Sequence, residues 1–247
     1  MSENAKVYIH ELIDIIGHNR ARYFHHMTAN WCPIGRAERN MSCFGVWGTV
    51  GSTGRWPEVV NLWELDGWDG LAANFAHELA NPSLQDSSLA EWWSAAAELR
   101  RGGFDRVLVP EPWSPTIAEL TAADVRGVVY AHELIRVGAG RVRPLLDAVH
   151  AQARDAVTAL GGVAIGAFNV AMRNDDEALL LWAFREWDAW VRYEHAWDAG
   201  GLGGWRSALV DADAVVTRTL LADAPLAPLR IGRQPEESDR RPLSEIT

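Results

Sequence analysis

The stretch Val7–Ile13 reads VYIHELI, and Val129–Ile135 reads VYAHELI. Six of the seven positions are identical, at an offset of 122 residues. Three further matches follow in the same order: Arg20-Ala21-Arg22 with Arg141-Val142-Arg143, Gly45-Val46-Trp47 with Gly166-Ala167-Phe168, and Leu62-Trp63 with Leu181-Trp182. Because the order is kept while the offset drifts only to 119, we predict two diverged copies of one unit of roughly 120 residues, fused head to tail.

Each copy has the residue pattern of a β-α-β-β-α-β unit. β-branched and apolar runs predict strands at 7–16, 43–50, 59–65 and 104–109, and again at 128–137, 163–171, 179–185 and 215–221. Helix-forming runs predict helices at 19–30, 68–79, 89–101, 141–160 and 187–212. Pro33 and Gly35 are expected to end the first helix, and Asn81-Pro82 to separate the next two.

This element order predicts an α+β protein made of two ferredoxin-like repeats, at 1–110 and 127–230. Residues 111–126 are expected to form a proline-stiffened linker, and 231–247 a C-terminal tail that is extended or partly disordered. Each four-stranded sheet would carry helices on one face only, so its other face needs a cover. The two open faces are expected to pack together as a barrel, with a ligand cavity between the sheets.

Composition excludes several classes of protein. The chain has 247 residues, 48% of them hydrophobic, and its 23 basic and 33 acidic residues give a net charge of −10. An acidic surface repels phosphate backbones and anionic membranes, so we expect neither nucleic-acid nor membrane binding. Two cysteines without metal-type spacing predict no metal site. With no signal-peptide pattern and no apolar run near the ~20 residues of a membrane helix, the chain is expected to be cytoplasmic.

The hairpin of the first copy carries a family resemblance. Residues 48–56, GTVGSTGRW, followed by 59–66, VVNLWELD, resemble the NIPSNAP-type branch of the dimeric α+β barrel superfamily. Glu11-Leu12 is similar to the first strand of that group, whereas Ile13 stands where the group usually has arginine. The resemblance covers about the first 75 residues. It implies the barrel fold and leaves the reaction open, because the superfamily includes heme enzymes, cofactor-free monooxygenases, decarboxylases, cyclases and isomerases.

A tyrosine–histidine pair recurs on the first strand of each copy. Tyr8 and His10 share one face of their strand, as Tyr130 and His132 do on theirs. Histidine can pass protons near neutral pH, and tyrosine can donate to a developing oxyanion. The alternative is that both pairs are structural and hydrogen-bond across the interface between the sheets, which their repetition favours.

The first helix of copy one differs from its counterpart in copy two. It is rich in polar and aromatic residues, among them Tyr23, His25 and His26. One hypothesis places the functional site in copy one, with His25 or His26 as an acid/base group or an axial heme ligand. The alternative is a solvated histidine pair on the helix surface.

Tryptophan is unusually frequent, with 13 in the chain. Trp47 and Trp63 stand on neighbouring strands of the hairpin and are expected to form one apolar wall, with Asn61 on the face of Trp63. Arg55, in the turn, either binds a substrate carboxylate or is solvated.

The resulting hypothesis is a cofactor-free lyase or isomerase acting on a hydrophobic or aromatic substrate in a tryptophan-lined cavity. His10 and His25 are the acid/base candidates and Tyr8 the oxyanion donor, with Tyr23, His26, Arg55, Asn61, Trp47, Trp63, Tyr130 and His132 as substrate contacts. The alternatives are a heme enzyme of the same superfamily and a non-catalytic ligand-binding or assembly protein. The chain is also expected to form a homodimer, because small barrels often associate.

Overall fold

The strands form a closed antiparallel barrel. The computed structural model describes residues 3–80 and 86–247. The barrel order is β1-β3-β2-β8-β5-β7-β6-β4. The bounds are β1 (Val7–Ile15), β2 (Ser42–Thr49), β3 (Glu58–Leu65), β4 (Arg100–Pro110), β5 (Val129–Arg136), β6 (Gly162–Val170), β7 (Glu177–Phe184) and β8 (Val215–Asp223).

Two ferredoxin-like sheets make up this barrel, as the repeat predicts. The order β4-β1-β3-β2 of the first sheet is repeated as β8-β5-β7-β6 in the second. The register repeats as well, since His10 pairs with Leu62 and His132 with Leu181. Short antiparallel joints, β2 with β8 and β4 with β6, close the barrel.

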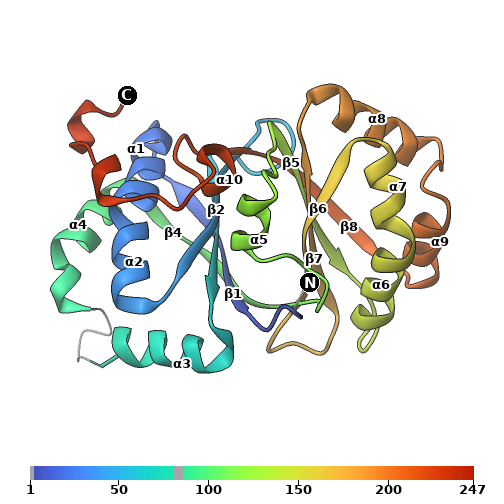
Figure 1. The fold of residues 1–247 in the computed structure, drawn as a ribbon, viewed down its shortest axis with the longest axis horizontal. Coiled ribbons are helices and arrows are strands. Elements are labelled where there is room, and N and C mark those ends of the chain that lie inside the picture. Colours follow the sequence, from blue (N-terminus) through green and yellow to red (C-terminus); the bar gives the residue numbers. More distant parts are fainter. Residues whose placement is uncertain (1–2, 81–85) are drawn as a thin grey trace.

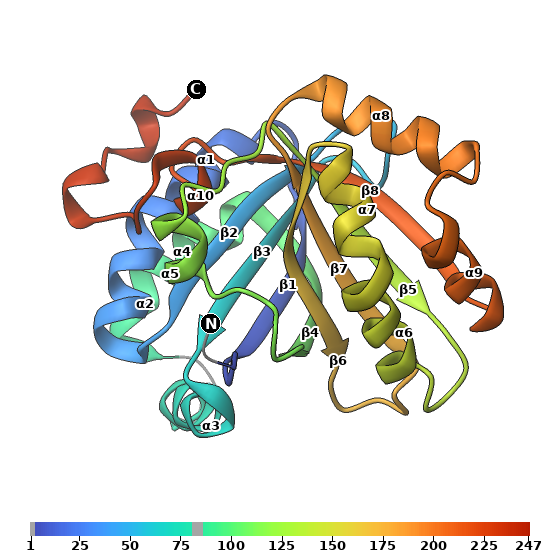
Figure 2. The same ribbon diagram turned by 45° about the vertical axis from the view of Figure 1, so that its right-hand side comes forward.

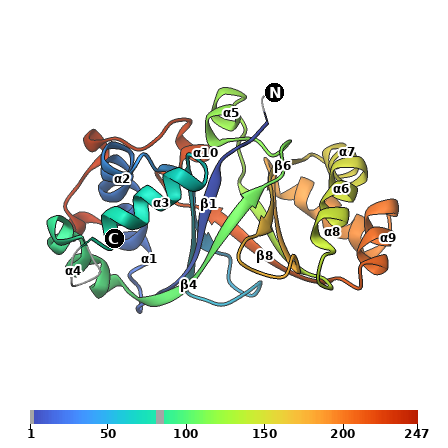
Figure 3. The same cartoon turned by 90° about the horizontal axis from the view of Figure 1, so that it is seen from below.

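Helices cover the outer face of each sheet (Figures 1 and 3). The first repeat carries α1 (Arg20–His25), η1 (His26–Trp31), α2 (Cys32–Arg39), α3 (Gly67–Glu78), η2 (Ser87–Leu89) and α4 (Ala90–Leu99). The second carries α6 (Val142–Ala148), η3 (Val149–Ala153), α7 (Arg154–Ala159), α8 (Trp187–Asp198) and α9 (Gly203–Asp211). Core residues therefore form two outer layers between sheet and helices and a third inside the barrel.

Pro33 does not end the first helix, contrary to the sequence prediction. The helical path continues through a π-helical turn, η1, into α2 and ends at Asn40, which adopts a left-handed conformation with φ 48°. Proline lacks the N–H that would bond four residues back, and a π turn is one way a helix absorbs this defect. The carbonyl of Ala29, left without that donor, instead accepts from Arg240 Nε at 3.3 Å.

Two other predicted helical regions differ from the structure or lie outside it. The segment 187–212 contains two helices, because the left-handed Gly200 and Gly203 separate α8 from α9. The expected break at Asn81-Pro82 lies outside the described residues. None of the helices in the described ranges is long and apolar enough to cross a membrane.

The segment joining the repeats contains a helix that closes one end of the barrel. α5 (Ile117–Ala122) begins with a capping box in which the Thr116 side chain accepts from the Glu119 N–H, and Glu119 accepts from the Thr116 N–H. Ile117 and Leu120 are both 3% exposed and pack into the barrel core beside Leu229 of α10 (Pro228–Ile231). Figure 2 shows α5 and α10 side by side over the first sheet.

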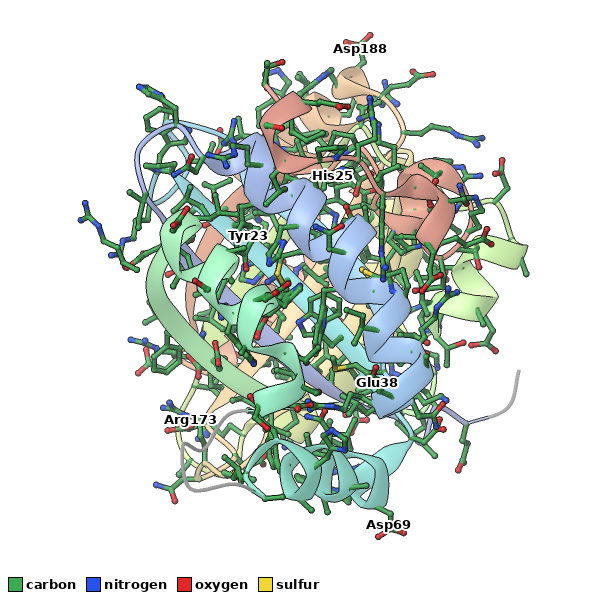
Figure 4. The ribbon with its side chains drawn as sticks, turned by 90° about the vertical axis from the view of Figure 1, so that its left-hand side faces the viewer. Tyr23, His25, Glu38, Asp69, Arg173 and Asp188 are labelled. Atoms are coloured by element: carbon green, nitrogen blue, oxygen red, sulfur yellow. The ribbon has the colours of Figure 1, made fainter. Side chains whose placement is uncertain are left out.

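The C-terminal tail packs on the first repeat, which corrects the expectation of an extended or partly disordered arm. Gln234 donates to the carbonyl of Cys43 at 2.7 Å and accepts from its N–H at 3.0 Å. Arg36 donates to the Pro235 carbonyl at 3.0 Å. The short helices η4 (Glu237–Asp239) and η5 (Leu243–Glu245) follow, and the chain between them contacts α1 and η1 through Arg241 with His25 and Arg240 with Ala29. Figure 4 shows the tail lying over this helical segment.

Candidate active site

The interior of the barrel is filled with side chains. Tyr8, Phe44, Trp47, Tyr130 and Phe168 are at most 1% exposed there and pack edge to face or tilted against one another. The expected substrate cavity between the sheets is therefore replaced by a packed core, because bulky inward residues from both repeats meet at the axis.

His10 and His132 meet inside this core. Their Nε2 atoms are 2.9 Å apart, and the two residues are 1% and 5% exposed. One ring must donate and the other accept, so at least one is neutral. Burial, followed by the charge of the partner histidine, lowers the pKa of His10 well below its usual value, and burial also lowers the pKa of His132 to about 4. This geometry favours the structural alternative for the pair.

The two inward tyrosines are also engaged. Tyr8 donates to Glu64 Oε2 at 2.8 Å, and Tyr130 donates to Asp223 Oδ2 at 2.6 Å. Burial is the main cause that raises the pKa of each phenol. Because their protons are committed to buried carboxyl groups, neither tyrosine is placed to serve an oxyanion.

Trp47 and Trp63 do not form one wall. Trp47 belongs to the barrel interior, whereas Trp63 packs in the layer between the first sheet and its helices. The register causes this, since Trp47 pairs with Val60 while Trp63 pairs with Cys43, and alternate residues of a strand face opposite sides. Arg55 is 70% exposed and pairs with Asp14 at 2.8 Å at the rim of the barrel.

The histidines of the first helix occupy two different places. His25 Nε2 lies 3.0 Å from the N–H of Arg241 under the C-terminal tail, and Figure 4 shows its position beneath that segment. His26 stacks on Trp92 at 4.6 Å, with both ring nitrogens within hydrogen-bond distance of Trp92 or Asn30. Both side chains are buried, so the solvated alternative is excluded.

A polar cluster lies between the first sheet and its helices. Glu11 Oε2 accepts from Asn61 Nδ2 and from Trp63 Nε1, both at 2.8 Å. Asn61 Nδ2 also donates to the hydroxyl of Tyr23 at 2.9 Å, which leaves the buried Asn61 Oδ1 without a partner among the described residues. Tyr23 extends from α1 into this layer (Figure 4), where burial and Glu11 raise the pKa of its phenol.

The second repeat builds a related cluster on the equivalent glutamate and tryptophan, Glu133 and Trp182. Its tyrosine comes from α8 instead of α1, and an arginine is added. Glu133 accepts from Trp182 Nε1 at 3.1 Å and from the hydroxyl of Tyr193 at 2.6 Å. Arg218 Nε donates to Glu133 Oε1 at 2.7 Å. Its guanidinium also lies over the rings of Tyr193 and Trp197, at 4.7 and 4.1 Å. Glu133 is fully buried, and a buried carboxylate needs a partner of opposite charge. Arg218 is that partner.

The first repeat has an aspartate where the second has this arginine. Glu133 pairs across the sheet with Arg218, and the equivalent Glu11 pairs with Asp105. Residues directly opposite in an antiparallel pair bring their side chains together on one face, so two carboxyl groups meet here. Asp105 remains accessible to solvent, yet partial burial and then the charge of Glu11 raise its pKa to about 6.

Asp105 lies in the wall of a pocket between α4 and the start of β4. The pocket has a volume of about 340 Å³ and is lined by Ile13, Trp93, Ala97, Arg100, Arg101, Gly102, Gly103 and Asp105. The register of β1 with β4 shifts at Asp14/Ile15, and Gly102 has φ +136°, a conformation that favours glycine. This irregular strand start turns Arg100 and Asp105 toward the same space.

The sequence analysis gave a site in copy one as one of two alternatives and named Tyr23, Asn61 and Trp63, but it did not name Asp105 or Arg100. The register that aligns Asp105 with Arg218 could not be read from the sequence, since these positions lie outside the matched segments. The pairing of the strands reveals the difference: an aspartate, Asp105, stands opposite Glu11, whereas an arginine, Arg218, stands opposite Glu133.

One group of side chains could hold a metal ion, but its geometry favours another role. Ligand atoms of Glu38, His77 and Asp86 lie within 4.8 Å of one another. Asp86 already accepts from Arg39 and His77 at 2.9 Å. Hydrogen bonds, led by that from Ser88, hold the pKa of Asp86 well below its usual value. Asp86 therefore links α2 to α3 through its hydrogen bonds with Arg39 and His77.

Comparison with known proteins supports the fold. No protein-family model matches the chain, and no curated protein matches it. It is similar to the crystal structure of an anthrone oxidase-like protein, with a TM-score of 0.57, 10% identity and coverage of 90% of this chain and 94% of that one. It is also similar to a candidate monooxygenase from Lactobacillus acidophilus NCFM, with a TM-score of 0.53, 10% identity and coverage of 90% of this chain and 97% of that one. For a dye-decolorizing peroxidase from Bacteroides thetaiotaomicron VPI-5482 the TM-score is 0.51 and the identity 10%, with coverage of 94% of this chain and 96% of that one.

These likenesses define a class of architecture. The chain has the dimeric α+β barrel fold, formed within one polypeptide by two ferredoxin-like repeats. At 10% identity they show the fold alone.

Proposed function

We propose that this protein is a cofactor-free enzyme that moves protons on a hydrophobic, ring-containing substrate, with Asp105 as the catalytic acid/base. The observation that carries the proposal is the carboxyl pair Glu11–Asp105, at the position where the second repeat has a closed ion pair. Two carboxyl groups in different environments are a recurring acid/base arrangement. Here Glu11 accepts hydrogen bonds from Asn61 and Trp63, while the pKa of Asp105 is raised.

Each residue has a distinct part in the proposed reaction. The Asp105 carboxylate takes a proton from an acidic C–H or O–H of the substrate, and the electron pair passes into the adjoining electron-withdrawing group. Arg100, whose charge acts on Asp105, lies in the same pocket and stabilises the developing anion. Asp105 then returns the proton to another atom, which gives isomerisation, or to a leaving group, which gives elimination. Glu11 is a positioning residue, because its charge adds to partial burial in raising the pKa of Asp105 to about 6.

The proposed reaction is of the lyase or isomerase class expected from the sequence, but Asp105 takes the acid/base role that was expected of His10 and His25. His10 is committed to His132, and His25 to the tail, so the carboxyl pair takes over proton transfer. The NIPSNAP-type resemblance of the hairpin stays a prediction, as do the cytoplasmic location and the homodimer, because the solved structures bear on the barrel fold and not on these points.

The heme alternative fits the residues poorly. An axial ligand needs a histidine nitrogen that is free and faces an apolar cavity. Each of the four buried histidines, His10, His25, His26 and His132, has Nε2 within 3.2 Å of a partner in the described part of the chain. His10 Nδ1 has no partner among residues 3–80 and 86–247, but it lies in the packed barrel core. The buried histidines of the described residues are therefore not arranged to hold a heme.

Hydrogen–deuterium exchange tests the proposal without knowledge of the natural product. Ring ketones with acidic C–H bonds, such as 2-tetralone and anthrone, would be incubated with the protein in D₂O and followed by proton NMR. The wild type is expected to accelerate exchange, and Asp105→Asn to lose about 10²-fold or more of that acceleration. His10→Gln, the matched control in the barrel core, is expected to retain it.

Three outcomes distinguish the alternatives. Retained exchange in Asp105→Asn would contradict the assignment of the base. No exchange by the wild type on any probe would favour the non-catalytic binding alternative. Oxygen uptake that accompanies proton loss would place the reaction with oxidases rather than lyases or isomerases, and an oxygen electrode detects it.

A further inference from the structure

The pocket beside Asp105 has a charge distribution that selects a type of substrate. Arg100 and Arg101 are adjacent at the beginning of β4 and both line the pocket, while Asp105 lies further along the same strand. Among the described residues neither arginine forms a close ion pair with a carboxylate, although the charge of Arg100 acts on Asp105 and on the phenol of Tyr23. In a chain of net charge −10, two adjacent arginines without such partners form a local site for an anion.

The rest of the lining suits a flat apolar body. Ile13 and Ala97 supply aliphatic surface, and Trp93 supplies an aromatic one. The Arg100 guanidinium lies 5.7 Å from the centroid of the Trp93 ring, so charge and aromatic surface are contiguous. A volume of about 340 Å³ is at the small end of ligand pockets and suits a body of one or two fused rings.

We propose that the pocket binds a one- or two-ring aromatic carboxylate, with its anionic group on Arg100 and Arg101 and its ring between Trp93 and Ile13. The orientation follows from charge, because Asp105 repels a carboxylate and the arginines attract it. The acidic C–H or O–H of the ring system then points to Asp105. This inference names the substrate class of the proposed active site, and so it rests on the proposed function.

Binding of 2-naphthoate and of its neutral analogue 2-naphthalenemethanol, measured by isothermal titration calorimetry, tests the inference. The wild type is expected to bind 2-naphthoate at least 10-fold more tightly than the alcohol, with an affinity that falls as salt rises. Arg100→Gln and Arg101→Gln are each expected to weaken 2-naphthoate binding by about 5- to 10-fold and to leave alcohol binding within about 2-fold. Arg100→Lys, which keeps the charge, should recover part of the loss.

Arg185→Gln is the matched control, because Arg185 is 66% exposed on the other repeat and pairs with Asp124. Equal affinity for acid and alcohol, or the same loss in the control as in Arg100→Gln, would overturn the inference.

The Asp105→Asn variant separates this inference from the proposed function. Removing the negative charge should preserve or tighten 2-naphthoate binding while proton exchange on the ketone probes is lost. Tight, arginine-dependent binding without wild-type exchange activity would remove the enzyme proposal and leave an aromatic-acid binding site. Exchange activity that depends on Asp105, with no arginine effect on the anion, would keep the enzyme and remove the carboxylate.

Discussion

Glu11 and Glu133 occupy equivalent positions but have opposite surroundings. Glu133 is fully buried and meets Arg218 at 2.7 Å, while Glu11 accepts from Asn61 and Trp63 and faces Asp105 across the sheet. The second repeat has a charge pair at this position, whereas the first has two carboxyl groups opposite each other, of which Asp105 lines a pocket. A residue needed only for the shared fold is expected in both repeats, so a difference between the repeats at this position points to a role specific to one of them.

Removal of Arg218 should destabilise the fold strongly. Arg218→Ala leaves the buried carboxylate of Glu133 without its partner, and breaking a buried pair in this way costs about 3–5 kcal/mol. Urea unfolding followed by circular dichroism measures the loss. Arg185→Ala, at an exposed pair, is the control and should change the free energy of unfolding by less than about 1 kcal/mol. A loss for Arg218→Ala no larger than the control would show that the pair is not needed.

Residue periodicity predicted the strands well because alternate positions of each strand face different layers. It could not predict the end of the first helix or the role of the linker. The path through Pro33 depends on a π turn and on Arg240 from the distant tail, which no local pattern encodes. Helix α5 is only six residues long, and its apolar side is explained by the barrel end that it covers.

Truncation of Leu120 tests α5 as a plug of the barrel. Leu120→Ala removes a side chain that is 3% exposed and packs with the barrel core, so we expect a loss of about 2–4 kcal/mol. Leu79→Ala is the matched control, since Leu79 is 53% exposed. Chemical denaturation of both variants provides the comparison. If Leu120→Ala loses less than about 1 kcal/mol, α5 is a surface segment rather than part of the core.

The repeat predicted the whole architecture, and the packing of the two halves decided where the site could lie. VYIHELI and VYAHELI bring His10 and His132 to the barrel axis as equivalents. Their contact, together with the aromatic residues around it, fills the space in which the sequence analysis placed the substrate. The site that we propose therefore lies in the outer layer of the first sheet, a location that could not be predicted without knowing how both faces of the sheet are packed.

Buried carboxyl groups make the stability of the whole molecule depend on pH. Burial raises the pKa of Asp223 to about 7, so between about pH 4 and 7 the folded state binds more protons than the unfolded state at this group. Its contribution to stability is therefore present at low pH and is lost as the pH rises through 7. Asp223→Asn removes this dependence and still accepts from Tyr130.

Thermal unfolding at pH 5 and pH 8 checks the sign. The stability of Asp223→Asn relative to the wild type is expected to rise by about 1–3 kcal/mol over this range, which is several degrees in Tm for a chain of this size. Asp198→Asn, at an exposed position, should show no such change. A relative stability of Asp223→Asn that is equal at the two pH values would contradict the buried titration.

The carboxyl pair in the first repeat is most directly tested by a carbon-13 NMR titration of the Asp105 carboxyl group in the wild type and in Glu11→Gln, with assignment from Asp105→Asn. We predict that Asp105 titrates near pH 6 in the wild type. Removal of the neighbouring negative charge should lower this pKa by about half a unit to one unit. An Asp105 that titrates near pH 4 in the wild type, or a pKa that Glu11→Gln leaves unchanged, would contradict the account.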